Sequence, residues 1–223
     1  RTCNWINSYL LIQYEKLCIV ESDMFIIQSI DDIFELNTNS ALFYKEKYKN
    51  NLLVNYILNK NYILKNNKNI DRLNQKIKVD LNKLLNINKN GSILNGGLFL
   101  IKPNIKDYYK SINNLKYVLE YNSKFPNEIL FLLNNPVCYT LPVKYNFLHD
   151  YLKKKLIKHY KYYEDIKLIH FNNTLYKPID IIKTNYIDKL QTTEYKFLIN
   201  LYKKFIYDKY YQKINNLLEQ YKI

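Results

Sequence analysis

The sequence is poor in the residues that bend or cross-link a chain: among 223 residues there are only 3 glycines, 5 prolines and 3 cysteines. Cys3, Cys18 and Cys138 are too few and too widely spaced for a disulfide framework, which excludes the disulfide-rich secreted class and favours a reducing compartment. No apolar run approaches the about 20 residues that cross a membrane, and no signal peptide is recognisable. These absences predict a soluble protein of the cytoplasm.

Basic residues, by contrast, are abundant: 34 Lys and Arg against 20 Asp and Glu give a formal charge of +14. Such a charge is found in proteins that bind nucleic acids or membrane surfaces. Here the lysines are mixed with Asn, Ile and Tyr along the whole chain, and only Lys153–Lys155 forms a cluster. This mixture is typical of AT-rich genomes, such as those of giant or insect viruses and some protozoan parasites. We therefore expect no nucleic-acid partner, and a viral protein would work in the host cytoplasm.

The pattern of apolar residues, 48% of the chain, predicts a single α/β domain over residues 1–223. Periodic Leu and Ile predict a helical insertion at about 37–92 and a helical extension at about 190–223. The other segments predict helices over 1–14, 105–121 and 127–134, and strands over 17–20, 98–102, 137–141 and 166–171. The expected apolar faces of the first two of these helices are Trp5, Tyr9 and Ile12, and Ile112, Leu115 and Leu119.

The most informative local feature is an acidic pair directly after a predicted strand. Leu17–Val20 runs into Glu21 and Asp23, so both carboxylates stand at the carboxyl edge of a sheet, where α/β folds place ligands and divalent metals. The pair alone is a weak signal, because two acids at a strand end are more often a solvated turn, by roughly three to one. His170 alone is likewise more often a core histidine, by about two to one. Whether these residues form a metal site therefore has to be judged from other parts of the chain.

The segment around this pair resembles the metal-binding segment of glycosyltransferase family eight, in particular its glycogenin-like members. The resemblance covers Gln13–Lys16 before the strand, the acidic pair itself, and Ser29–Phe34 after it. Further blocks are similar to motifs of the same family and follow in the family's order, which a chance match does not explain. These blocks are 94–103, 125–130, 141–146, and 168–171 with Lys177-Pro178.

The resemblance implies a GT-A type fold, which is an α/β fold with a Rossmann-like mixed sheet flanked by helices. It also implies a retaining glycosyltransferase that moves a sugar, with glucose expected, from a UDP-sugar to a protein or glycan acceptor with Mn²⁺, or with Mg²⁺ in its place. In the family, strands that hold the uracil and ribose precede the acidic strand. Because this chain begins at Arg1 inside the pattern, we expect those strands to belong to a longer polypeptide. A homodimer is left open.

The resemblance further assigns roles to individual residues. Two carboxylates and one imidazole, a set that suits Mn²⁺, are the expected metal ligands: Glu21, Asp23 and His170. The expected donor-binding residues, which include a lysine as a point charge for the diphosphate, are Asn95, Gly96, Asn173 and Lys177. The expected catalytic pair, which holds the sugar, is Asn127 and Glu128.

Several positions depart from the family pattern: Glu21 replaces an Asp, Trp5 a Lys near the donor phosphates, Asn127 an Asp, and Glu128 a Gln, while Asn172 and Asn173 stand in place of a Gly. Because an amide is no nucleophile, Asn127 cannot form a covalent intermediate. Either Glu128 is the nucleophile, or the acceptor attacks on the same face as the leaving diphosphate, which we favour. A purely structural alternative is that Asn127 caps the helix after Pro126.

Two other functions stay open on the sequence alone. The first is a non-catalytic relative that keeps the fold as an interaction protein, and the departures at Glu21, Trp5 and Asn127 favour it. The second is a basic nucleic-acid-binding protein, which would show salt-sensitive binding to arbitrary oligonucleotides. The ordered motif blocks argue against this second alternative.

Overall fold

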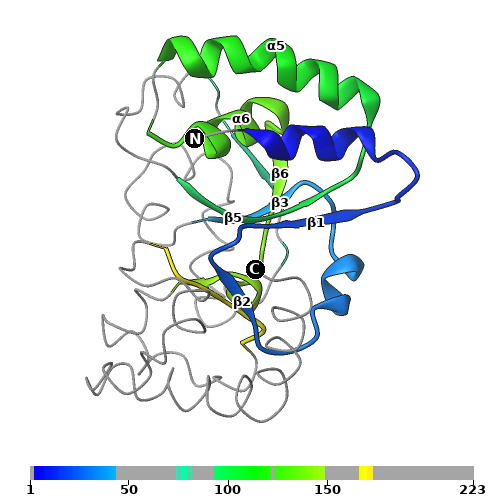
Figure 1. The fold of residues 1–223 in the computed structure, drawn as a ribbon, viewed down its shortest axis with the longest axis vertical. Helices are drawn as coiled ribbons and strands as arrows, with labels where there is room; N and C mark the ends of the chain where they lie inside the picture. Colours follow the sequence, from blue (N-terminus) through cyan, green and yellow to red (C-terminus); the bar gives the residue numbers. More distant parts are fainter. Residues whose placement is uncertain are drawn as a thin grey trace, which may run out of the picture. The chain divides into compact units, whose positions relative to one another are not determined.

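The computed structural model describes residues 3–43, 74, 76–79, 81, 93–121, 124–148 and 166–172. The chain separates into two compact units, the first comprising Arg1–Ser22 and Ser29–Asn146 and the second Asp23–Gln28 and Phe147–Ile223 (Figure 1). The expected helical extension at about 190–223 lies outside the described residues. Helices and strands are combined in a mixed α/β structure, as the sequence predicts.

The first unit contains a mixed sheet of five strands in the order β1-β5-β3-β6-β4. All pairings are antiparallel except the parallel one between β3 and β6. Strand β5 is central to the first unit, with all of its residues buried between β1 and β3. The strands are β1 (Leu17–Val20), β3 (Ser40–Phe43), β4 (Lys76–Lys78), β5 (Leu94–Ile101) and β6 (Val137–Thr140).

Two of these strands correct the expected helical insertion at about 37–92. Ser40–Phe43 forms β3 and Lys76–Lys78 forms β4, both inside the sheet, and the rest of the insertion is almost entirely outside the described residues. Both strands are short, and their pairing partners β5 and β6 are distant in sequence. Strand formation in such short segments depends on pairing and burial more than on local preference, so the prediction of a helix is wrong for these two segments. For the part of the insertion outside the described residues it stays a prediction.

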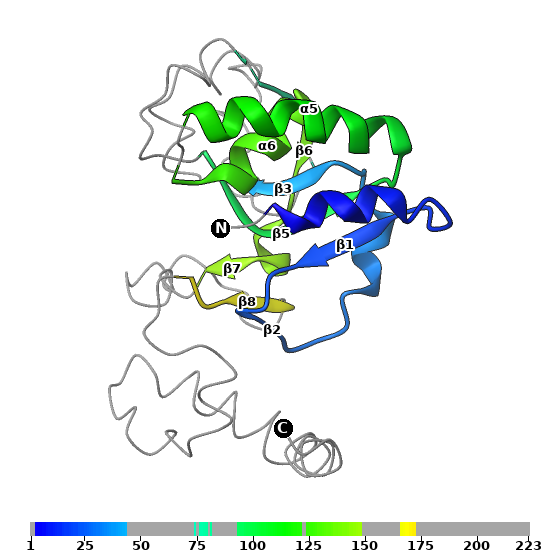
Figure 2. The ribbon, with the colours of Figure 1, turned by 45° about the horizontal axis from the view of Figure 1, so that its top comes forward.

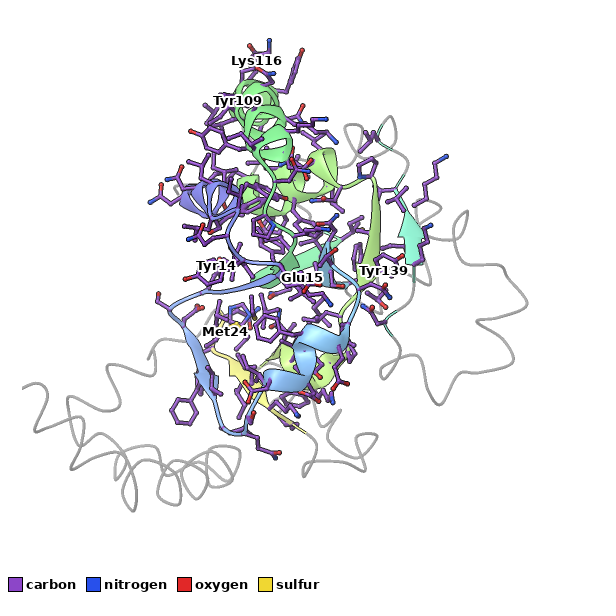
Figure 3. The ribbon with its side chains drawn as sticks, turned by 90° about the vertical axis from the view of Figure 1, so that its right-hand side faces the viewer. Tyr14, Glu15, Met24, Tyr109, Lys116 and Tyr139 are labelled. Carbon is purple, nitrogen blue, oxygen red and sulfur yellow. The ribbon has the colours of Figure 1, made fainter. Side chains whose placement is uncertain are left out.

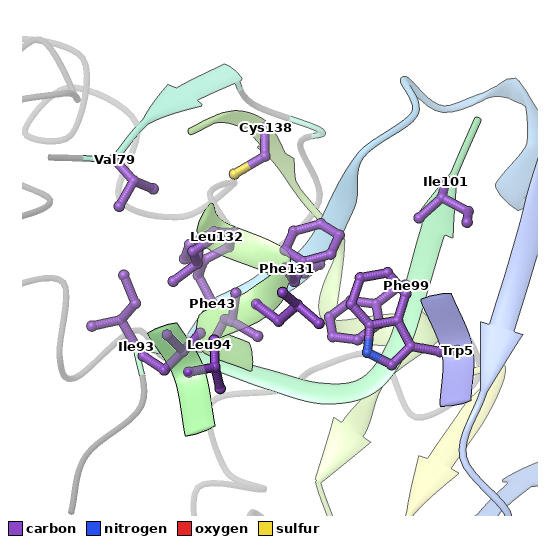
Figure 4. Packing of buried hydrophobic residues seen from close by; sticks show 14 of the residues in the cluster. Trp5, Phe43, Val79, Ile93, Leu94, Phe99, Ile101, Phe131, Leu132 and Cys138 are labelled. Carbon is purple, nitrogen blue, oxygen red and sulfur yellow. The ribbon is translucent and has the colours of Figure 1, made fainter. Parts of the chain in front are cut away.

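The helices η1 (Asn4–Leu10), α5 (Ile105–Tyr121) and α6 (Pro126–Asn134) lie on one side of this sheet (Figures 1 and 2). Helix α6 packs on β5, and α5 packs on both α6 and η1. Their aromatic core is formed by Trp5, Phe99 and Phe131 (Figure 4). The rings of Phe99 and Phe131 are stacked with centroids 4.4 Å apart, and Trp5 lies 5.2 Å from Phe99. The apolar stripe on η1 therefore anchors the first helix to the sheet.

Two predicted helix faces need correction. Helix η1 is a 3-10 helix that ends at Leu10, so Ile12 lies beyond it and is 65% exposed. On α5, whose bounds agree with the prediction, Ile112 and Leu119 are exposed, while Val118 is buried. Figure 3 shows Tyr109 and Lys116 on the outer side of the same helix.

A polar network turns α5 in this direction. Buried Ser111 accepts a hydrogen bond from the Asn134 side chain and donates one to the backbone carbonyl of Asp107. Lys110 donates to the carbonyl of Asn134, which is the last residue of α6. These buried polar groups require partners, so the polar contacts with the end of α6 contribute to fixing which side of α5 is covered. Tyr108, Leu115 and Val118 of the same helix face pack against the core of the first unit.

Two short 3-10 helices of the first unit are joined by an ion pair. Helix η2 covers Asp31–Glu35 and helix η4 covers Val143–Tyr145. The Lys144 Nζ lies 3.0 Å from an Asp32 carboxylate oxygen, and burial followed by a hydrogen bond with Asp32 raises the pKa of Tyr145. Asp32 therefore has a structural role here.

The second unit contains a three-stranded sheet in the order β2-β8-β7, formed by β2 (Met24–Ile26), β8 (Leu168–His170) and β7 (Phe147–Leu148) (Figure 2). Strands β2 and β8 are antiparallel, with Met24 opposite His170, and β7 and β8 are parallel. The sequence predicted β8 and missed the other two, which have only three and two residues. Within the described part of the chain, no helix is long and apolar enough to cross a membrane.

Replacing Phe99 by alanine should lower the free energy of unfolding by about 3–5 kcal/mol, since it empties a buried site between Trp5 and Phe131. Phe34→Ala is the matched control, because the Phe34 side chain is 41% exposed; its cost should stay below about 1 kcal/mol. Denaturant unfolding followed by circular dichroism measures both values. Equal losses in the two variants would contradict the packing described here.

Candidate functional site

The antiparallel register brings two predicted site segments to one edge of the first sheet. Val20 lies opposite Leu98, and one residue further the backbone N–H of Glu21 donates to the carbonyl of Gly97 at 2.9 Å. The carboxyl end of β1 therefore meets the amino-terminal half of β5. As a result, Glu21 of the acidic pair is placed beside the segment that holds Asn95 and Gly96.

Strand β5 is irregular at this point. In its pairing with β3, Phe99 lies opposite Ala41, but the next residue of β3, Leu42, lies opposite Asn95. Gly96–Leu98 thus bulges out of the ladder with β3. Bulges bend a strand and re-aim its side chains, and they are frequent next to active sites. In β5 the bulge lies between Asn95, near the start of the strand, and the buried Phe99, toward its end.

The orientation of the Asn95 side chain is fixed by two hydrogen bonds. Its Oδ1 accepts from the backbone N–H of Gly97 at 2.9 Å and from the Nδ2 of Asn146 at 2.8 Å. Because a backbone N–H can only donate, the atom that faces Gly97 is the amide oxygen. The NH₂ group of Asn95 therefore points the other way. Asn146 was given no role by sequence reasoning, although it ends the block 141–146, and the structure identifies it as a positioning residue.

Gly96 allows the Glu128 side chain to approach the backbone of β5 closely. A Cβ added at Gly96 would lie 3.2 Å from both Cδ and Oε1 of Glu128, which is tighter than an ordinary contact. The carboxylate of Glu128 is also near Cys3: burial, and then the negative charge of Glu128, raise the pKa of the Cys3 thiol. The structure thus brings Gly96 and Glu128, two of the predicted residues, into direct contact.

Asn127 does not cap α6. The cap position is Phe125, which forms no side-chain capping hydrogen bond, and the helix begins at Pro126. The alternative in which Asn127 only caps the helix is therefore wrong. Its Oδ1 is buried and has no hydrogen-bond partner among the residues that the structure describes. A buried amide oxygen without a hydrogen bond costs about 1–3 kcal/mol of stability. A ligand group that donates a hydrogen bond to this oxygen would recover that free energy.

In the second unit, the structure brings together Asp23 and His170. The Nε2 of His170 lies 3.1 Å from an Asp23 carboxylate oxygen, and the His170 side chain is almost completely buried. Two backbone features hold the pair: Met24 faces His170 across β2 and β8, and the N–H of Phe171 donates to the carbonyl of Asp23 at 2.9 Å. A carboxylate and an imidazole at this separation offer ligand atoms that could hold a metal ion.

The remaining predicted residues lie elsewhere in the chain. Trp5, at a position where the resembled family has a lysine, is only 9% exposed and belongs to the aromatic core of the first unit. Asn173 and Lys177, predicted to bind the donor, lie outside the described residues. Among the described residues, the predicted site residues of the first unit are Glu21, Asn95, Gly96, Asn127 and Glu128, and those of the second unit are Asp23 and His170.

Comparison of the chain with protein-family models and with curated proteins found no match.

Asn95→Ala should lower the free energy of unfolding by about 1–3 kcal/mol, because it leaves the Gly97 N–H and the Asn146 amide buried without this acceptor. Asn113→Ala, at an exposed position of α5, makes the same chemical change and should stay within about 0.5 kcal/mol of the parent. Denaturant unfolding of the two variants and the parent protein measures these free energies. A loss in Asn95→Ala as small as that of the control would argue against the two hydrogen bonds.

Proposed function

We propose that the protein is a retaining glycosyltransferase of the GT-A type that transfers a sugar from a UDP-sugar. The observation that supports this proposal most strongly is the pairing of Asp23 with His170 at 3.1 Å. These residues stand far apart in the sequence, and the family pattern alone singles out both of them as metal ligands. A chance resemblance would give no reason for them to meet.

Asp23 and His170 would be two ligands of the metal, and Glu21 would be the third. Only Ser22 separates Glu21 from Asp23, so their Cα atoms are at most about 7.6 Å apart whatever the local conformation. Two carboxylates with an imidazole suit Mn²⁺ better than Mg²⁺, since Mg²⁺ prefers oxygen ligands. When bound, the metal would supply positive charge to the leaving diphosphate.

The sugar would be held by Asn95, Asn127 and Glu128, of which Glu128 lies against the β5 bulge at Gly96. The Asn95 NH₂ group can donate a hydrogen bond, while Asn127 Oδ1 and the Glu128 carboxylate can accept hydrogen bonds from hydroxyl groups. Asn127, as an amide, cannot attack the anomeric carbon. We therefore favour same-face attack by the acceptor hydroxyl, with Glu128 binding the sugar without forming a bond to it.

A non-catalytic interaction protein with the same fold is the second candidate. The burial of Trp5 favours it, because a side chain within the aromatic core leaves no cation at that position for the donor phosphates. An enzyme without a cation at this position would depend more strongly on its metal to neutralise the donor phosphates. Donor binding that requires the metal would therefore support the enzyme.

UDP should bind at least about tenfold more tightly with Mn²⁺ than with a chelator, equivalent to about 1.4 kcal/mol, and Mn²⁺ should exceed Mg²⁺. Asp23→Ala and His170→Ala should each remove this metal-dependent gain. Asp31→Ala is the matched control, since Asp31 is exposed at the start of η2 and its carboxylate accepts a hydrogen bond from Ser29. Isothermal titration calorimetry measures the affinities, and circular dichroism checks the fold. Equal UDP affinity with and without metal in the parent protein would refute the metal site.

The mechanism is tested by Glu128→Gln, which keeps the shape of the side chain and removes its charge. With same-face attack, turnover of UDP-glucose should fall only about tenfold, the effect of weakening one charge-assisted hydrogen bond. With Glu128 as nucleophile, turnover should be almost lost, and mass spectrometry of the parent protein with a slow donor should detect glycosylated Glu128. A trapped adduct would overturn same-face attack.

A further inference from the structure

The exposed apolar side chains of the described residues are concentrated in two segments of the first unit. Twelve large apolar or aromatic side chains are exposed in the described part of the chain, and nine of them lie on α5 or between the end of η1 and β1. Single exposed apolar side chains are normal, but a contiguous group of them marks an interaction surface. The nine are Ile105, Tyr109, Ile112, Tyr117 and Leu119 on α5, and Leu10, Leu11, Ile12 and Tyr14 before β1.

These two segments are neighbours in the first unit. Helix η1 packs on α5, and burial, together with the charge of Asp107 in the first turn of α5, raises the pKa of Tyr9 to about 12. The end of η1 therefore lies near the start of α5. Figure 3 shows Tyr14 and Tyr109 on the same side of the first unit.

On α5, the exposed side chains follow the spacing of a coiled-coil seam. Ile105, Tyr109, Ile112, Lys116 and Leu119 are all exposed and recur at intervals of four and three residues, which is the a/d pattern of two packed helices. The opposite face of α5 already packs on the core of the first unit. A seam of this kind buries its side chains against a second helix, and the single lysine is a residue type that fixes the register of such a pair.

The charges beside the seam are complementary to a second copy of the same helix. Lys106 and Glu120 are exposed and each follows a seam residue directly, so both lie on the same side of the seam. When two copies of α5 run antiparallel about Ile112, Lys106 of one copy lies within about 3 Å along the helix axis of Glu120 of the other. Two-fold symmetry forms this pair twice.

We propose that this face of α5 is the interface of a two-fold symmetric homodimer, in which the two α5 helices pack antiparallel along the seam. Ile105 then meets Leu119 of the second copy, and Ile112 lies beside the two-fold axis. The physical basis is the exposed seam together with its self-complementary charges. The inference is independent of the proposed function, because α5 carries none of the candidate site residues.

The exposed apolar surface is large enough for such an interface. Half-exposed side chains of this size leave on the order of 100 Å² each in water. The nine exposed side chains therefore approach the about 800 Å² that each partner of a stable complex buries. The segment before β1, which lies near the start of α5, would contact the end of α5 of the second copy.

Sedimentation velocity of the intact protein between about 1 and 100 µM tests the proposal, and the parent protein should dimerise within this range. Ile112→Glu should weaken dimerisation at least about 100-fold, because the two-fold axis brings two carboxylates together in an apolar contact. Phe34→Glu is the matched control: Phe34 lies on η2, outside the seam, and is 41% exposed against 43% for Ile112. Its dissociation constant should stay within about threefold of the parent value.

Charge reversal distinguishes a second copy from any other partner. Lys106→Glu and Glu120→Lys should each weaken dimerisation about tenfold, because each turns two attractions into two repulsions. The variant with both reversals should regain the parent affinity. Positions 106 and 120 are about 21 Å apart along α5, so this recovery can come only from contact between copies.

A parent protein that stays monomeric at about 100 µM overturns the proposal. If it is monomeric but sediments with vesicles of phosphatidylcholine and phosphatidylserine, the face binds a membrane instead. A dimer that persists in Ile112→Glu, or that the double reversal does not restore, uses another surface and also overturns it. Circular dichroism checks the fold, and if Ile112→Glu does not fold, the charge reversals give the answer. Weakening by the single reversals with recovery in the double variant supports the interface.

Discussion

The arrangement of the candidate site depends on the complete burial of β5. A strand with neighbours on both sides and every residue buried has its register fixed, because a slip would place apolar side chains wrongly. That register decides that Glu21 follows β1 beside Gly97. The same strand carries the bulge at Gly96–Leu98. Because Gly96 has no side chain, Glu128 can approach the backbone there. The positions of the candidate residues of the first unit thus follow from the packing of one strand.

The elements that were predicted from the sequence include the long helices and the apolar strand β1, and also the short strands β6 and β8. Helix α5 has the predicted bounds, α6 starts one residue before its predicted start, and β1 coincides with its apolar run. The elements that were missed, β2, β3, β4 and β7, have between two and four residues. A strand of this length has no stability of its own and exists because a partner distant in sequence pairs with it. Local patterns cannot contain that information.

The candidate site was predictable to the extent that it consists of motifs. The pairing of Asp23 with His170 and the contact of Gly96 with Glu128 join residues that the family pattern had selected. The role of Asn146 was not predictable, because its hydrogen bond to Asn95 joins two segments that are distant in the sequence. The lack of a hydrogen-bond partner for Asn127 Oδ1 among the described residues was likewise not predictable. The sequence allowed Asn127 to cap α6, whereas in the structure the cap position is Phe125.

The departures from the family pattern change the balance of charge in the proposed site in one direction. Trp5 replaces a cation by an indole that the aromatic core requires, so a lysine there would have to leave its charge in an apolar environment. Glu128 replaces an amide by a carboxylate. Both changes remove positive charge or add negative charge where an anionic donor would bind. In a protein with the proposed function, the metal would therefore have to neutralise more of the charge of the diphosphate.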